Sequence, residues 1–230
     1  MNVPTFGKGK DVIFMHGWGG DASAFLFCAK RLESEYRCHL AEFAGFGESA
    51  PPARPYTVRD YAREIVEYMN SAGIEKAVLV GHSFGGRVAM EIAAAYSERV
   101  KSVVLVDSAG IKPKRKFSYY VKVALHKTLK KLGFAGLKGS SDYQGLSDVM
   151  KQTFVKVVNY DQTLILRHIS CPTAIFWGKD DKDTPPYMAE IIHNGIKDSH
   201  VFMLDGGHFA YLEEPETFFA VLRAFLKETA

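Results

Sequence analysis

The stretch Gly81-His82-Ser83-Phe84-Gly85-Gly86 decides the fold of this chain, because it places a serine between two glycines at the spacing G-x-S-x-G. The apolar run 77–80 before it predicts a short buried strand, and the run 87–95 after it predicts a helix. Glycines two residues on either side of Ser83 remove the Cβ atoms that would clash when a serine takes unusual backbone angles. The pattern therefore predicts a strand, a tight turn and a helix, with the Ser83 hydroxyl exposed.

A serine hydroxyl is a weak nucleophile by itself, so a catalytic role also requires a base, an orienting acid and donors for a developing oxyanion. The sequence His16-Gly17-Trp18-Gly19-Gly20 follows the apolar run 12–15, at the end of another predicted strand. We expect the backbone N–H groups of Trp18 and Phe84 to bind the oxyanion, since Phe84 begins the helix after the serine. His16 is interpreted as a residue that fixes this loop rather than as a second base.

Two later strand ends offer an acid and a base. The predicted strand 173–177 is followed by three aspartates, Asp180, Asp181 and Asp183. The last predicted strand, 201–204, leads into Asp205-Gly206-Gly207-His208. The order Ser, Asp, His along the chain favours a catalytic role for His208 over that of an ordinary surface histidine.

In these motifs the chain resembles the α/β-hydrolase family, and the resemblance extends almost from end to end. Residues 16–20 are similar to the family's oxyanion loop, residues 81–86 to its nucleophile elbow and residues 206–208 to its histidine loop. Residues 44–49 are similar to the loop after the next strand, although Ala44 stands where a proline is usual. The resemblance implies the family's fold and a serine nucleophile.

The family pattern for the acid is Gly, two residues, Asp and then Pro four positions later. Gly178, Asp181 and Pro185 fit this pattern, so the resemblance assigns the acid role to Asp181, with Asp180 as the alternative. It implies a catalytic triad of Ser83, Asp181 and His208. No cofactor is expected, and a metal site is not favoured because no histidine lies at ligand spacing beside the aspartates.

The length of 230 residues and the 47% of apolar residues suit one α/β domain with a large core. Strand-like segments alternate with helical patterns, which predicts an α/β fold with a mostly parallel sheet of about six or more strands and helices on both faces. The strands are expected near 11–16, 37–43, 76–82, 100–107, 173–178 and 200–205. Residues 1–110 and 161–230 form the predicted core, and 111–160 a small inserted helical cap.

The predicted cap is strongly basic. It holds eleven Lys or Arg and two Asp, a net charge of +9, whereas the whole chain carries +3. On its first helical pattern, one side carries Lys122, Lys127, Lys130 and Lys131. This side is either a solvated face or a docking surface for an acidic carrier protein or an anionic substrate. Nucleic acid is not favoured, because no recognisable binding module is present.

No stretch approaches 18 consecutive apolar residues, and the N-terminus lacks the pattern of a signal peptide. We therefore expect no membrane span. The three cysteines show no C-x-x-C spacing and are expected to be reduced, which together with the missing signal favours the cytoplasm.

The function that these observations favour is the hydrolysis of small carboxylic esters or thioesters by a serine hydrolase through an acyl-enzyme. The pocket is expected to be lined by aromatic residues of the cap, namely Phe117, Tyr119, Tyr120, Phe134, Tyr143 and Phe154. One alternative is a carbon–carbon bond hydrolase with the same triad, since residues 106–111 resemble those enzymes. Another, of a different class, is a ligand receptor or interaction protein that retains the fold and a slow triad. The His-Gly-Trp-Gly and Gly-Phe-Gly motifs are also similar to those of carboxylesterases that cleave pimeloyl-carrier-protein methyl ester.

Overall fold

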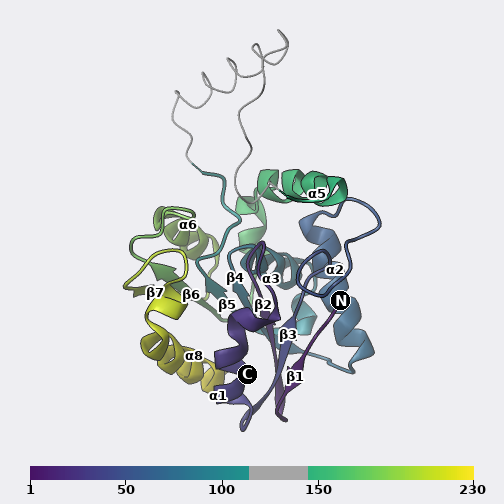
Figure 1. The fold of residues 1–230 in the computed structure, drawn as a ribbon. Coiled ribbons are helices and arrows are strands. Elements are labelled where there is room, and N and C mark those ends of the chain that lie inside the picture. The colour runs from purple at the N-terminus through teal and green to yellow at the C-terminus, as the bar shows by residue number, and fades with distance from the viewer. Residues whose placement is uncertain (114–144) are drawn as a thin grey trace.

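The computed structural model describes residues 1–113 and 145–230 and contains a seven-stranded sheet (Figure 1). The strand order is β1-β3-β2-β4-β5-β6-β7. The short β1 pairs with β3 in the antiparallel direction, and the other neighbouring strands are parallel. The bounds are β1 Thr5–Phe6, β2 Lys10–Met15, β3 Tyr36–Ala41, β4 Ala77–His82, β5 Val100–Val106, β6 Thr173–Gly178 and β7 Ser199–Leu204.

Alternate residues of each buried strand point to opposite sides of the sheet, so the continuous apolar strands present apolar side chains on both faces. Helices cover both faces and bury these side chains. Ile13 of β2 belongs to a core with residues of α2, α3 and α6, whereas Val12 belongs to a second core with residues of α1 and α8. The α-helices are α1 Leu26–Leu32, α2 Val58–Ser71, α3 Phe84–Ala95, α5 Asp148–Asn159, α6 Tyr187–Gly195, α7 Ala210–Glu213 and α8 Pro215–Thr229. Short 3-10 turns are η1 Ala22–Phe25, η2 Ser97–Arg99 and η4 Thr163–His168.

Local sequence explains where several of these helices begin. Thr57 and Asp60 form a capping box at the start of α2, each side chain accepting from the other residue's backbone N–H. Asp21 accepts a hydrogen bond from the Ser23 N–H at η1, and Pro215 is the first residue of α8. Side-chain caps such as those of Thr57 and Asp21 typically contribute about 1 kcal/mol each to stability.

The predicted fold class is confirmed: the sheet is mostly parallel and has helices on both faces. The six expected strands are present with bounds close to the predicted ones, and β1 is an addition. Residues 114–144, and with them most of the expected cap, lie outside the described residues. The division into a core and a cap at 111–160 therefore stays a prediction.

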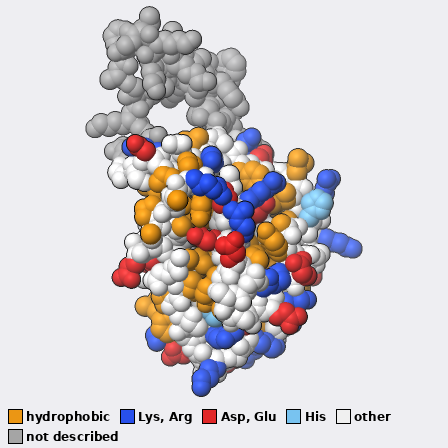
Figure 2. Space-filling model, turned by 90° about the vertical axis from the view of Figure 1, so that its right-hand side faces the viewer, with side chains coloured by type: hydrophobic (Ala, Val, Ile, Leu, Met, Phe, Trp, Pro, Cys, Tyr) orange, Lys and Arg blue, Asp and Glu red, His pale blue; other side chains and the backbone are white. Residues whose placement is uncertain are grey.

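Charges of both signs lie together on the side of the molecule that carries α2 (Figure 2). Asp60 pairs with Arg54 and Arg63, and Arg63 also lies 3.7 Å from Glu67.

Within residues 1–113 and 145–230, no helix combines the length and the hydropathy that crossing a membrane requires. The four lysines expected to attract an acidic carrier lie outside these ranges.

Candidate active site

Ser83 occupies the turn between β4 and α3 in a strained conformation. Its φ is 50° and its ψ is −108°, a region that residues other than glycine rarely adopt. A Cβ on Gly81 would collide with the backbone of Gly85, and a Cβ on Gly85 would collide with the Met15 carbonyl oxygen. The two glycines of the motif therefore leave room for the tight turn at Ser83 and let it pack closely against β2.

Ser83 is hydrogen-bonded to His208, which is hydrogen-bonded to Asp181. Ser83 Oγ lies 2.9 Å from His208 Nε2, and His208 Nδ1 lies 2.8 Å from Asp181 Oδ2. The fold thus brings together three residues from the ends of β4, β6 and β7. With the proton on Nδ1, the ring donates to Asp181 and its Nε2 accepts from the Ser83 hydroxyl.

Asp181 differs from the two neighbouring aspartates in its burial and its hydrogen bonds. It is only 3% exposed, whereas Asp180 and Asp183 are exposed. Its Oδ1 accepts from the backbone N–H groups of Asp183 and Thr184, and its Oδ2 also accepts from the Thr184 hydroxyl at 2.6 Å. These donors hold the carboxylate toward the His208 ring.

The pKa values of this pair shift in opposite directions. Burial lowers the pKa of the His208 ring, but the hydrogen bond and charge of Asp181 outweigh this effect, so the pKa lies above its usual value. Burial raises the pKa of Asp181, but the hydrogen bonds from His208 and Thr184 hold it below its usual value. Each group therefore stabilises the charged form of the other.

The peptides of Trp18 and Phe84 are oriented by the carbonyl groups that precede them. The Gly17 carbonyl accepts from the Gly20 N–H at 3.0 Å and from His16 Nδ1 at 2.7 Å. Since N–H and C=O point in opposite directions in a trans peptide, the Trp18 N–H is turned away from these donors. The Ser83 carbonyl accepts from several N–H groups within and beside α3, which turns the Phe84 N–H outward in the same way. Both residues line the same cavity as Ser83.

His16 fixes the loop that contains Trp18, as expected from the sequence. Its Nε2 accepts from the Phe43 N–H at 3.2 Å, so the proton is on Nδ1 and is donated to the Gly17 carbonyl. Burial lowers the pKa of this ring, which keeps it neutral. The neighbouring loop is fixed by Glu42, whose carboxylate accepts from the backbone N–H groups of Glu48 and Ser49.

Two buried residues near the site were missed by the sequence analysis. His82 Nε2 donates to the His208 carbonyl at 2.8 Å, and burial lowers the pKa of its ring to about 3. Asp107 has a φ of 44°, and its Oδ1 accepts from the Gly178 N–H at 2.7 Å. Burial raises the pKa of Asp107 to about 8. A polar residue directly after the buried strand β5 was the available signal for Asp107.

A cavity of about 600 Å³ lies above Ser83 and His208. Trp18 forms one wall, and its ring contacts those of Phe84 and Phe154 with centroids 5.3 and 5.1 Å apart. Phe154 lies on α5, which also contributes Val157 and Val158. Phe154 is thus a lining residue as expected, whereas the other aromatic residues proposed for the pocket lie outside the described ranges.

Three groups at the site are close enough to share a cation: one ligand atom each from Asp181, Asp183 and His208 lies within 4.8 Å of the others. The Asp181 carboxylate and the His208 ring already hydrogen-bond to each other, and the second ring nitrogen of His208 is hydrogen-bonded to Ser83 Oγ. This set therefore fits proton transfer better than metal binding.

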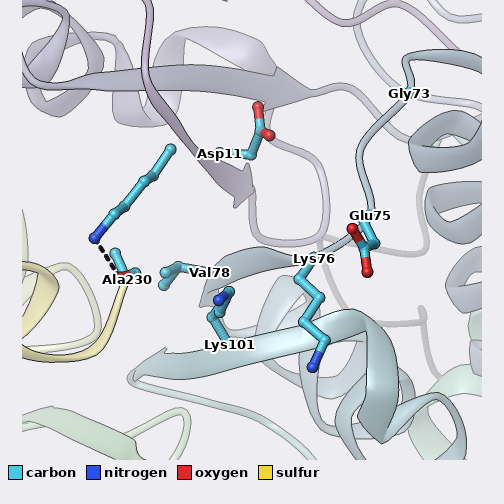
Figure 3. A pocket seen from close by; sticks show the side chains of 8 residues that line it. Asp11, Gly73, Glu75, Lys76, Val78, Lys101 and Ala230 are labelled. Carbon is cyan, nitrogen blue, oxygen red and sulfur yellow. Dashed lines mark hydrogen bonds between the residues drawn. The ribbon is translucent and has the colours of Figure 1, made fainter.

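A second cavity, of about 550 Å³, lies at the opposite ends of the parallel strands (Figure 3). Lys10 and Lys101 stand at the beginnings of β2 and β5, and Lys76 precedes β4. The carboxylates of Asp11 and Glu75 line the same cavity. Its lysines are exposed and mixed with acidic groups, and this cavity is separate from Ser83.

The chain matches the alpha/beta hydrolase family over residues 12–221 and belongs to this family. A solved structure of an esterase from Exiguobacterium antarcticum superposes with a TM-score of 0.81 at 24% identity, covering 98% of this chain and 94% of that one. This likeness confirms the fold.

Three relatives differ in their chemistry. The chain is 29% identical, over 96% of its length, to the dihydrolipoyllysine-residue acetyltransferase component of the acetoin cleaving system of Cupriavidus necator, of which it spans 64%. It is 27% identical, over 97% of its length and 86% of the relative's, to 2-hydroxy-6-oxo-6-(2'-aminophenyl)hexa-2,4-dienoic acid hydrolase of Metapseudomonas resinovorans. It is 24% identical, over 98% of its length and 97% of the relative's, to pimeloyl-[acyl-carrier protein] methyl ester esterase of Vibrio vulnificus. The family and its hydrolase members support an enzyme of this fold.

Proposed function

We propose that this protein hydrolyses small carboxylic esters or thioesters through an acyl-enzyme formed on Ser83. The observation that carries the proposal is the hydrogen-bonded chain from Ser83 Oγ through His208 to Asp181, with distances of 2.9 and 2.8 Å. This is the arrangement that activates a serine hydroxyl for attack on a carbonyl carbon.

In the proposed reaction, Ser83 Oγ attacks the carbonyl carbon while His208 Nε2 takes the hydroxyl proton. The Trp18 and Phe84 N–H groups stabilise the negative oxygen of the tetrahedral intermediate. His208 then gives the proton to the leaving alcohol or thiol, which leaves an acyl group on Ser83. Water attacks this ester with His208 again as the base, and Asp181 stabilises the imidazolium in both halves.

A second candidate is the cleavage of a carbon–carbon bond next to a ketone. It is supported by the similarity to the dienoic acid hydrolase of Metapseudomonas resinovorans. The same three residues would serve both reactions, so the substrate and not the triad distinguishes them.

The proposal is tested by assaying the purified protein on p-nitrophenyl esters with acyl chains of two to eight carbons, beside a ring-fission dienone. We expect ester hydrolysis that disappears in Ser83→Ala. Cleavage of the dienone with kcat/KM well above that of every ester would instead establish the carbon–carbon bond hydrolase.

The rate should depend on pH through His208, which is active only when its Nε2 is unprotonated. Since its pKa is raised above the ordinary value of about 6.5, kcat/KM is expected to increase with pH and to reach its plateau only above neutrality. In Asp181→Asn the midpoint should shift to lower pH, because the carboxylate that raises the pKa is removed. If kcat/KM of the wild type did not change between pH 5 and 8, this result would contradict the role of His208 as the limiting base.

An acidic carrier protein remains a further prediction for the partner. It is supported by the basic segment 111–160 and by the similarity to the esterase of Vibrio vulnificus, whose name includes a carrier-linked substrate. Changing Lys122, Lys127, Lys130 and Lys131 to Glu would raise KM for a carrier-bound ester more than for a free ester if the carrier docks there.

A further inference from the structure

Arg87 is a buried cation at the cavity of the candidate active site. It lies on α3, four residues after Ser83, which places it one helical turn, about 6 Å, farther along the axis. The side chain lines the cavity together with Ser83 and His208, although the residue is only 7% exposed.

Within the part of the chain that the structure describes, no carboxylate forms an ion pair with Arg87. Its Nη1 donates to the Tyr160 carbonyl at 2.6 Å, and no other hydrogen bond from its guanidinium is made to the described residues. Burial lowers the pKa of Arg87 to about 10, partly offset by the charge of Asp161, so the group is cationic at neutral pH.

The nearest carboxylate on the same helix, Glu91, has other partners. Its Oε1 accepts from Arg59 at 3.1 Å, and its Oε2 accepts from the Tyr160 hydroxyl at 2.9 Å. Gln162 lies between the two residues, because its Nε2 donates to the Arg87 carbonyl at 2.9 Å and lies 3.5 Å from Glu91 Oε2. Glu91 is therefore satisfied by groups other than the Arg87 guanidinium.

A buried guanidinium without a carboxylate partner is costly to desolvate, and it is well suited to bind an anion. We propose that Arg87 binds a carboxylate group of the substrate, so that the preferred substrates are esters that carry a free carboxylate beside the scissile bond. A carboxylate fits better than a phosphate monoester, because one cation balances one negative charge and the planar guanidinium matches the two carboxylate oxygens. This inference rests on the proposed ester hydrolysis.

The test compares matched pairs of esters. On the acyl side, p-nitrophenyl hemiesters of succinate, glutarate and adipate are compared with p-nitrophenyl butyrate, valerate and hexanoate. On the alcohol side, the butyryl ester of 4-hydroxybenzoate is compared with phenyl butyrate. We expect the charged ester to have the higher kcat/KM in at least one pair, with the difference mainly in KM.

In Arg87→Gln the ratio of kcat/KM for the charged ester to that for its neutral partner should decrease by roughly 10- to 100-fold, the range for losing a charged hydrogen bond. Arg87→Lys should retain part of the preference, because it keeps the charge but not the planar fork. Arg59→Gln is the matched control, since it removes an arginine from the same network outside the cavity and should leave the ratio unchanged. Thermal unfolding checks that each variant is folded.

The outcomes separate the two proposals. If the wild type hydrolyses no ester, the proposed function fails. If Ser83-dependent hydrolysis is observed but every neutral ester is preferred, or if Arg87→Gln and Arg87→Lys keep the wild-type ratio, the role of Arg87 is wrong while the proposed function stands. A greater preference for a phosphate-bearing ester than for the carboxylate esters would also overturn the assignment.

Discussion

Replacing Ser83 by alanine is expected to reduce kcat by on the order of 10³-fold or more, because the attacking oxygen is removed. His208→Ala should have an effect of similar size, since the hydroxyl loses the base 2.9 Å away. The double variant should be about as inactive as either single variant, because the two residues act as one unit. Steady-state kinetics on a p-nitrophenyl ester measures all three.

His200→Ala is the matched control for the histidine, because His200 is an exposed residue of β7 away from the cavity. It should retain the wild-type rate. Full activity of Ser83→Ala, or additive losses in the double variant, would show that these two residues do not act together on the substrate.

The second large effect is expected for Asp181→Asn, which should reduce kcat by on the order of 10²-fold or more. The amide neither stabilises the imidazolium nor holds the proton on Nδ1 as the carboxylate does. Asp180→Asn and Asp183→Asn are close in sequence and conservative in size, and the structure leaves both side chains exposed. They should remain near the wild-type rate.

The comparison of these three variants assigns the acid. A loss of 10²-fold or more in Asp180→Asn, together with a small effect in Asp181→Asn, would transfer the role to Asp180. Asp181 also accepts backbone hydrogen bonds from Asp183 and Thr184, so its substitution can disturb the structure of the loop. The unfolding temperature of each variant separates such a structural effect from a catalytic one.

Much of the fold was predictable because a parallel sheet covered on both faces requires continuous apolar runs. The runs before Ser83, Asp181 and His208 end where β4, β6 and β7 end, so the polar residues that follow gather at one edge. The two-residue strand β1 was missed, since two residues are too few for a recognisable pattern and their pairing depends on β3.

The supporting residues could not be predicted, because their contacts join distant parts of the chain. His82 donates a hydrogen bond to the carbonyl of His208, which lies 126 residues later in the sequence. Asp107 accepts one from the N–H of Gly178, which lies 71 residues later. Arg87 was expected only as part of a helix. Its significance depends on which carboxylates are within reach, and only the folded arrangement of Glu91, Arg59 and Tyr160 determines that.

The central claim, a covalent intermediate on Ser83, is tested most directly with a fluorophosphonate reagent and mass spectrometry of the digested protein. We predict loss of activity with one equivalent bound, found on the peptide that contains Ser83, and reaction slower by on the order of 10²-fold or more in His208→Ala. Label on another residue, or full hydrolytic activity with Ser83 completely modified, would contradict the account.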